Sequence, residues 1–232
     1  MGTCDYMACS DLGHYVLTLR GGELRWRKIH CPFSHAPMCE RVCINGVLYY
    51  LSLRSHDLSY VVIFFDVRSE SFKLVNTECR FNCPFHILVS YKGKLCGIRL
   101  DYDDGYYSGG LLLQLSMWIL EDVDKQEWSK HVYSLPVESD VVKFDRKLSV
   151  SGMTATGDIV LSMIYASKPF YVFYFNPGKN TLKIVEILGV GADSDYRVYA
   201  FVDYVEDLSV NGAMQLDSSV PLHYNAEASI VV

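Results

Sequence analysis

Soft metal ligands are crowded into the first hundred residues of the chain. All eight cysteines lie at or before Cys96, and no two form a Cys-x2-Cys pair. One segment is Cys79-x3-Cys83-x2-His86, and a second contains His30, Cys31, His35, Cys39 and Cys43. Thiolates and imidazoles this close together are typical ligands of structural zinc. Because they fall beside or inside predicted strands, we expect reduced thiols, no metal and no cofactor. A zinc site and disulfides stay open as alternatives.

Carboxylates and histidines form no recognisable active site. The sequence Asp101-Tyr-Asp-Asp-Gly105 resembles the start of a calcium loop, but the twelfth position is Leu112, where a bidentate Glu would be needed. Most other acids mark hairpin turns, where Asx side chains accept hydrogen bonds from backbone amides. The seven histidines have no Ser or Cys partner at a catalytic spacing. We therefore expect no enzyme activity and assign no catalytic residue.

Residues 101–110 are the candidate binding segment. Three tyrosines there have no predicted strand to belong to, and they alternate with Gly, Ser and Asp. Exposed tyrosine in such a setting gives a large contact area at low entropic cost, which suits protein recognition. The predicted protein-binding residues are Tyr102, Asp103, Asp104, Tyr106 and Tyr107. The alternative is a surface loop without a binding role.

Composition limits the classes of partner. The chain has 232 residues, 50% of them hydrophobic, and a formal net charge of −6. An acidic chain is a poor binder of phosphate backbones, so we expect no nucleic acid partner. No apolar run approaches the ~18 residues of a membrane span, and the first residues lack the pattern of a secretory signal. We expect a protein of the cytoplasm or the nucleus.

The segments around these candidate residues are mostly predicted to be β-strands. β-Branched and aromatic runs cover residues 47–51, 60–65, 159–163 and 170–175. Asn45-Gly46 is a strong type I′ hairpin signal, and Lys92-Gly93 and Thr156-Gly157 occupy comparable places. Only residues 137–148 could form a short amphipathic helix. The tryptophans lie inside strand patterns and are predicted core residues: Trp26, Trp118 and Trp128.

These strands and turns recur in a repeat of about 55 residues. Asp66, Asp122 and Asn176 lie 56 and 54 residues apart, and each stands six residues before a large apolar residue that starts the next strand. The middle repeat carries an insertion of nine or ten residues. Four short strands per regular repeat are typical of a β-propeller, with a β-sandwich as the alternative. The predicted fold is therefore all-β, a partial β-propeller of the kelch-like kind.

Partial units flank the three full ones. Residues 16–19 and 24–29, around Gly21-Gly22, predict the outer hairpin of one blade, and residues 196–202 predict the opening strand of another. We expect a short N-terminal segment over residues 1–13, the propeller-type domain over 14–210 and a poorly ordered tail over 211–232.

Seven motifs carry a family resemblance. They occur in the order that is typical of the F-box-associated β-propeller domain, type 3, of flowering plants. The chain resembles this domain from about residue 14 to 210. The motifs are VCINGVLYY (42–50), FDVRSESF (65–72), YKGKL (91–95), MWILED (117–122), EWSKH (127–131), PFYVFYF (169–175) and VDYVED (202–207).

The resemblance implies a protein-interaction domain. In that family the propeller follows an F-box, which docks on the adaptor of a cullin-based ubiquitin ligase, while the propeller holds the protein to be ubiquitinated. Residues 1–13 form no F-box, so the expected function is target recognition without ligase docking. A carbohydrate-binding propeller and a truncated, non-functional gene product are the alternatives.

Overall fold

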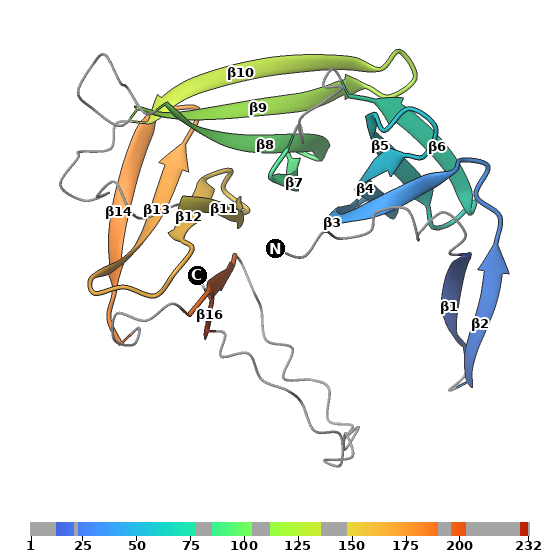
Figure 1. The fold of residues 1–232 in the computed structure, drawn as a ribbon, viewed down its shortest axis with the longest axis horizontal. Helices are drawn as coiled ribbons and strands as arrows, with labels where there is room; N and C mark the ends of the chain where they lie inside the picture. Colours follow the sequence, from blue (N-terminus) through green and yellow to red (C-terminus); the bar gives the residue numbers. More distant parts are fainter. Residues whose placement is uncertain are drawn as a thin grey trace. The chain divides into compact units, whose positions relative to one another are not determined.

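The computed structural model describes residues 13–20, 23–77, 85–103, 112–135, 148–189, 196–202 and 228–231. Regular structure in these ranges consists of strands (Figure 1). Among them, no helix has the length and hydropathy needed to cross a membrane. The strands are β1 (His14–Arg20), β2 (Glu23–Ile29), β3 (His35–Ile44), β4 (Val47–Arg54), β5 (Tyr60–Asp66), β6 (Ser71–Asn76), β7 (Ile87–Tyr91), β8 (Lys94–Asp103), β9 (Leu112–Asp122), β10 (Glu127–Leu135), β11 (Leu148–Met153), β12 (Ile159–Met163), β13 (Phe170–Asn176), β14 (Thr181–Ile187), β15 (Val198–Phe201) and β16 (Ala228–Val231).

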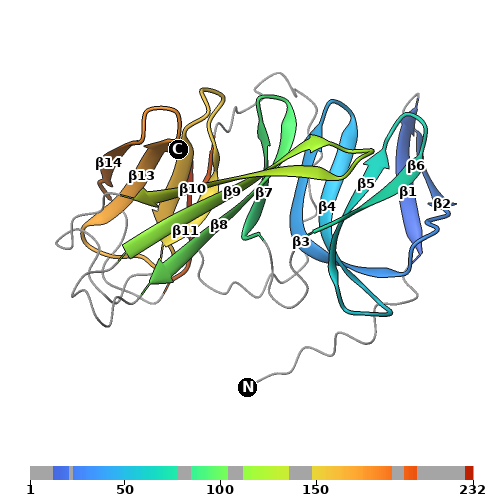
Figure 2. The same cartoon turned by 90° about the horizontal axis from the view of Figure 1, so that it is seen from above.

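Three four-stranded sheets keep their strands in chain order. They are β3-β4-β5-β6, β7-β8-β9-β10 and β11-β12-β13-β14, and in the first of them the strands lie side by side in Figure 2. Two-stranded sheets, β1-β2 and β15-β16, flank them in sequence. Sequential four-stranded sheets are the blades of a propeller. The predicted partial β-propeller, with three full blades and flanking half-blades, is confirmed.

Two compact units make up the chain. The first contains residues 1–99 and 117–131, and the second contains residues 100–116 and 132–232. Sheet β3–β6 and hairpin β1–β2 belong to the first unit, and sheet β11–β14 belongs to the second.

The predicted hairpin turns form for local reasons. Asn45 and Gly46 have φ of 51° and 81°, and Lys92 and Gly93 have φ of 51° and 76°. Positive φ at both central residues is what a type I′ turn requires. At the third site only Gly157 is left-handed, with φ of 88°, and its amide donates to the Thr154 carbonyl.

The repeated Asx residues cap the next turn of each blade. Asp66 Oδ1 accepts from the amides of Arg68 and Ser69, at 2.9 and 2.8 Å. Asp122 Oδ1 accepts from two amides in the same way, and Asn176 Oδ1 accepts from Lys179 N. Four residues after each Asx the backbone is left-handed, at Glu70, Gln126 and Asn180. The sequence repeat is therefore a repeat of one hairpin geometry.

Replacing Asp66 tests this turn. Asp66→Ala removes the acceptor of two amides, so we expect a lower midpoint of thermal unfolding at pH 7. Asp66→Asn keeps an acceptor oxygen, as Asn176 does in the third full blade, and should retain the midpoint. An unchanged midpoint in Asp66→Ala would contradict the capping role.

Acid should separate wild type from Asp66→Asn. The hydrogen bond from the Ser69 amide holds the pKa of Asp66 below its ordinary 3.8. A pKa lowered in the folded state stabilises the fold above the unfolded-state pKa, and this stabilisation is lost as pH falls through the folded-state pKa. The midpoint of thermal unfolding should fall more between pH 7 and about pH 3 for wild type than for Asp66→Asn. Equal losses would contradict the prediction.

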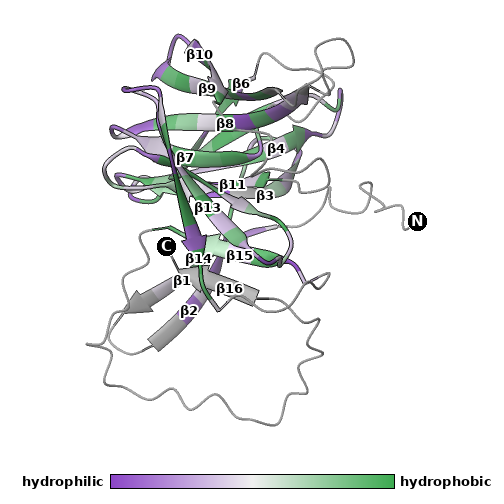
Figure 3. Cartoon of the chain, turned by 90° about the vertical axis from the view of Figure 1, so that its left-hand side faces the viewer, coloured by the Kyte–Doolittle hydropathy of each residue, from purple (hydrophilic) through white to green (hydrophobic). Residues whose placement is uncertain are grey.

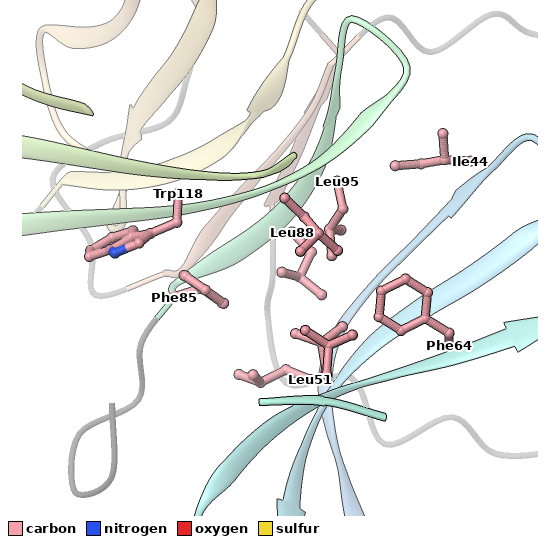
Figure 4. Close-up of a cluster of buried hydrophobic side chains, with 10 residues drawn as sticks. Ile44, Leu51, Phe64, Phe85, Leu88, Leu95 and Trp118 are labelled. Atoms are coloured by element: carbon pink, nitrogen blue, oxygen red, sulfur yellow. The ribbon is translucent and has the colours of Figure 1, made fainter. Parts of the chain in front are cut away.

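Apolar side chains from different strands form the core of each unit. In the first unit, Leu51, Phe64, Phe85, Leu95 and Trp118 belong to one buried cluster (Figure 4). In the second unit, the largest fully buried side chains of sheet β11–β14 are Ile159, Leu161, Phe170, Phe173 and Phe175. Figure 3 shows hydrophilic colour at several hairpin turns and hydrophobic colour along much of the strands between them.

The tryptophan prediction holds for Trp118 and is wrong for Trp26. Trp118 is 5% exposed, and half-buried Trp128 packs against the same cluster. Trp26 is 64% exposed. It pairs with Leu17 across the two-stranded sheet β1-β2, and Leu17 is itself 37% exposed. A two-stranded sheet leaves a face uncovered that a strand pattern alone would assign to the core.

Two expected segments fall largely outside the described residues. Of the possible helix over residues 137–148, only Leu148 is described, and it begins strand β11. Of the tail over 211–232, residues Ala228–Val231 form β16, which pairs in parallel with β15. Regular structure is therefore present in part of a segment for which the sequence predicts little order.

Candidate protein-binding site

The predicted binding segment does not assemble a site in the described residues. Tyr102 belongs to strand β8, which corrects the expectation that it has no strand. Its hydroxyl donates to the Leu148 carbonyl at 2.7 Å and accepts from the Leu148 amide. Burial raises the pKa of Tyr102 to about 12. This hydroxyl joins two segments of the second unit, so it already has partners within the chain.

The other predicted residues are not brought together with Tyr102. Asp103 ends β8, and its side chain lies outside the described residues. Asp104, Tyr106 and Tyr107 lie outside them entirely. Their binding role stays a prediction.

A pocket in the first unit is the better-defined surface. It has a volume of about 260 Å³ and lies where hairpin β1–β2 meets sheet β3–β6. Pockets for small organic ligands commonly measure about 300–1,000 Å³, so this one suits an inserted side chain better than a whole metabolite. It is lined by His14, Tyr15, Val16, Ile29, Pro37, Met38, Arg41, Leu48, Tyr50, Phe65 and Phe72.

The pocket has an apolar floor and an exposed rim. Tyr50 and Phe65 are each 8% exposed and form part of the floor. Tyr15, at 58% exposed, and the exposed Arg41 belong to the rim. Tyrosine and arginine beside a desolvated pocket are the residue types that dominate protein-binding energies.

Pairing and strand irregularity explain where the lining residues point. In β3 the register against β4 shifts between Pro37 and Arg41. A β-bulge turns side chains away from the regular alternation of a strand. Pro37, Met38 and Arg41 therefore all reach one pocket, although strict alternation would divide them between two faces.

Hairpin β1–β2 is held to sheet β3–β6 by side-chain contacts. Arg27 of β2 forms an ion pair and hydrogen bond with Glu70, in the turn between β5 and β6. The His14 ring packs edge-on against Phe72, with centroids 5.4 Å apart. Both contacts fix the wall of the pocket that the hairpin supplies.

Neutral polar groups lie beneath the pocket. The Tyr50 hydroxyl donates to His35 Nε2 at 2.9 Å, and His35 Nδ1–H donates to the Phe33 carbonyl at 3.0 Å. Burial lowers the pKa of His35, and burial and then His35 lower that of His14. Burial raises the pKa of Tyr50 well above its ordinary value. Neutral groups keep the floor suited to apolar insertion at physiological pH.

Sequence reasoning missed this pocket because its lining comes from two sheets. Its only local signal was Pro37, since proline inside a strand commonly marks an edge or a bulge. Nothing local connects Tyr15 with Arg41, which become neighbours of one pocket only after the hairpin docks.

Comparison with known proteins agrees with this architecture. The sequence profile named "F-box associated beta propeller domain" matches residues 6–205. F-box only protein 12 of Arabidopsis thaliana is 56% identical over 98% of this chain and 56% of its own length. Putative F-box protein At1g30930 of the same plant is 56% identical over 94% of this chain and 55% of its own length. F-box protein At3g57590, also from that plant, is 48% identical over 89% and 53%.

The chain spans about half the length of these curated relatives. The match covers the three full blades and the hairpin that precedes them. On sequence and on fold, the chain belongs to the F-box-associated β-propeller family.

Proposed function

We propose that this chain is the target-recognition part of an F-box type ubiquitin ligase subunit and that it binds another protein without catalysing a reaction. The relatives are F-box proteins, and an F-box docks on the adaptor of a cullin-based ligase. A propeller next to an F-box would hold the protein to be ubiquitinated. The expected location is the cytoplasm or the nucleus, and the net charge of −6 supports a partner other than nucleic acid.

The observation that carries the proposal is the pocket between hairpin β1–β2 and sheet β3–β6. It combines a buried aromatic floor with an exposed tyrosine and an exposed arginine at its rim. A hydrophobic or aromatic side chain of the target would insert, and an acidic residue beside it would meet Arg41.

Several described polar groups have structural partners, which supports a non-catalytic role. Both ring nitrogens of His35 already have partners. The capping carboxylates Asp66 and Asp122 are occupied by backbone amides at hairpin turns. Groups with these structural tasks are poor candidates for proton transfer.

Rim substitutions should remove target binding. The experiment fuses an F-box in front of the chain, expresses it in plant cells and quantifies captured proteins by mass spectrometry. We expect Tyr15→Ala and Arg41→Glu each to reduce one set of captured proteins by about 10-fold or more, as for interface hot spots. The adaptor and cullin, which bind the F-box, should be unchanged.

Matched controls lie on the second unit. Tyr165 is 53% exposed, and Lys183 is exposed on β14, so Tyr165→Ala and Lys183→Glu repeat the same chemical changes away from the pocket. If these controls reduce capture as much as the rim variants do, the pocket is not the binding site. If only chaperones are captured by every form, the interaction proposal is wrong.

A further inference from the structure

Three metal-binding side chains meet at the base of hairpin β1–β2. His14 begins β1, Cys31 lies in the connection from β2 to β3, and His35 begins β3. One ligand atom from each lies within 4.8 Å of the others. Two histidines and a cysteine are ligands that zinc accepts. The sequence alone placed Cys31 and His35 in a soft-ligand segment, but His14 joins them only in the folded unit.

The separations are within reach of a single ion. Cys31 Sγ lies 4.0 Å from His35 Nδ1. At a tetrahedral angle, Zn–S and Zn–N bonds of about 2.3 and 2.1 Å place these atoms about 3.6 Å apart, so the pair would have to close by about 0.4 Å. A pair at the 4.8 Å limit would have to close by about 1.2 Å or more to reach the same geometry. His14 is half-buried at the start of β1, and its ring already lies 5.1 Å from the His35 ring, measured between centroids.

The Phe33 carbonyl accepts both of the hydrogens that a bound cation would displace. It accepts from His35 Nδ1–H at 3.0 Å and from the Cys31 thiol at 3.6 Å. Both donors therefore direct hydrogen toward one oxygen. A cation held by Nδ1 and Sγ would replace these two hydrogens.

We propose that His14, Cys31 and His35 form a zinc site that fastens hairpin β1–β2 to the start of β3. His35 binds through Nδ1 and Cys31 through Sγ, and one ring nitrogen of His14 is the third ligand. Three protein ligands leave one position of a tetrahedral ion for water. This proposal departs from the expectation of no bound metal. Its argument does not rest on the proposed ubiquitin-ligase function, although His14 and Tyr50 also line the pocket of the first unit.

Tyr50 is positioned as the outer partner of the site. Its hydroxyl lies 2.9 Å from His35 Nε2. Metal-bound histidines commonly donate their other ring N–H to a carboxylate, a backbone carbonyl or water, which fixes the ring and its tautomer. The Tyr50 hydroxyl oxygen would accept this hydrogen bond from His35 in the same way. On zinc binding, the His35 proton leaves Nδ1, and by exchange with solvent a proton occupies Nε2. The Nε2–H group then donates a hydrogen bond to the Tyr50 hydroxyl oxygen. The Cys31 thiol loses its proton to solvent, so each ion releases one proton and no group changes oxidation state.

Cobalt provides a direct probe of these ligands. The full chain is freed of metal with a chelator under reducing conditions, titrated with Co²⁺ and then with Zn²⁺. We expect a thiolate-to-cobalt absorption band in the near ultraviolet that Zn²⁺ abolishes. Cys31→Ser should lack the band, and His14→Gln should weaken Zn²⁺ binding by more than about 100-fold. Tyr50→Phe should weaken it by about 10-fold, as for loss of an outer partner.

Matched variants and a tautomer measurement separate binding at these three ligands from binding elsewhere on the chain. The chain has eight cysteines, so the stoichiometry is the difference between wild type and Cys31→Ser, expected to be one ion. Cys43 is an exposed free cysteine of the same unit, and the His56 side chain is 70% exposed. Cys43→Ser and His56→Gln should leave binding unchanged. Nitrogen-15 NMR of wild type should show the His35 proton on Nδ1 without zinc and on Nε2 with zinc.

Any of three results would contradict the proposed zinc site. They are no saturable binding by wild type, binding that survives both Cys31→Ser and His14→Gln, and a His35 tautomer that zinc leaves unchanged. The NMR measurement uses wild type, so a variant that fails to fold does not remove the test. If zinc binds as proposed and rim variants still capture every target, the proposed function fails while the metal site stands.

Discussion

Phe64→Ala is expected to lower the free energy of unfolding of the first unit by about 3–5 kcal/mol. Phe64 is 5% exposed and belongs to the buried cluster with Leu51 and Trp118 (Figure 4). Its ring packs edge-on against Tyr49, with centroids 4.6 Å apart. Truncation removes this pair and leaves a cavity, because the surrounding β-strands are held by their ladders and can close in only partly.

Tryptophan fluorescence can measure this loss selectively. Trp26, Trp118 and Trp128 all belong to the first unit, so their emission during denaturant unfolding reports on that unit. Val67 is 52% exposed in a turn of the same unit, and Val67→Ala should stay within about 0.5 kcal/mol of wild type. If Phe64→Ala also stays within that range, the cluster does not stabilise the unit as its burial indicates.

Gly97→Ala is expected to cost about 3 kcal/mol, the upper part of the range for overpacking a core. Gly97 lies in β8 opposite Leu88 of β7. A Cβ atom at this position would lie 2.3 Å from Phe85 Cδ1 and 2.5 Å from Phe85 Cγ. Phe85 is 2% exposed and contacts the rings of Trp118 and Trp128. The added methyl group therefore has to displace a buried ring that already packs against two other rings.

A double-mutant cycle tests this cause. Phe85→Leu removes part of the obstructing ring, so Gly97→Ala should cost less in the Phe85→Leu background than in wild type. Gly178, in a turn of the second unit, has only Asn176 Oδ1 near its Cβ position, at 3.4 Å, and Gly178→Ala should have a small effect on stability. Additive effects of the Gly97 and Phe85 substitutions would show that steric conflict with the ring is not the reason.

Hairpin chemistry made much of the fold predictable. Asn45-Gly46 and Lys92-Gly93 form the expected type I′ turns, and Asp66, Asp122 and Asn176 cap the expected outer hairpins. Each signal acts within a few residues of its own position, so it needs no knowledge of the rest of the chain. The strand at residues 159–163 has the predicted bounds.

Errors and omissions occurred where a residue's environment depends on another element. Trp26 has the strand pattern of a core residue but lies on a two-stranded sheet with an uncovered face. Tyr102 looks like a loop residue, yet it ends up in β8 with its hydroxyl bound to the backbone of Leu148, 46 residues later. In both cases local sequence contains no information on what lies opposite.

The all-β class and the blade repeat follow from the amino-acid sequence, because turn residues and strand alternation act locally and recur at a regular spacing. The family was indicated by the resemblance of seven motifs. The binding pocket, the His14, Cys31 and His35 cluster and the contact of Gly97 with Phe85 become visible only in the folded chain. The pocket and the cluster depend on how hairpin β1–β2 docks against sheet β3–β6. Docking is set by complementary side-chain surfaces between residues distant in sequence, and a single sequence does not reveal which of its apolar faces will meet.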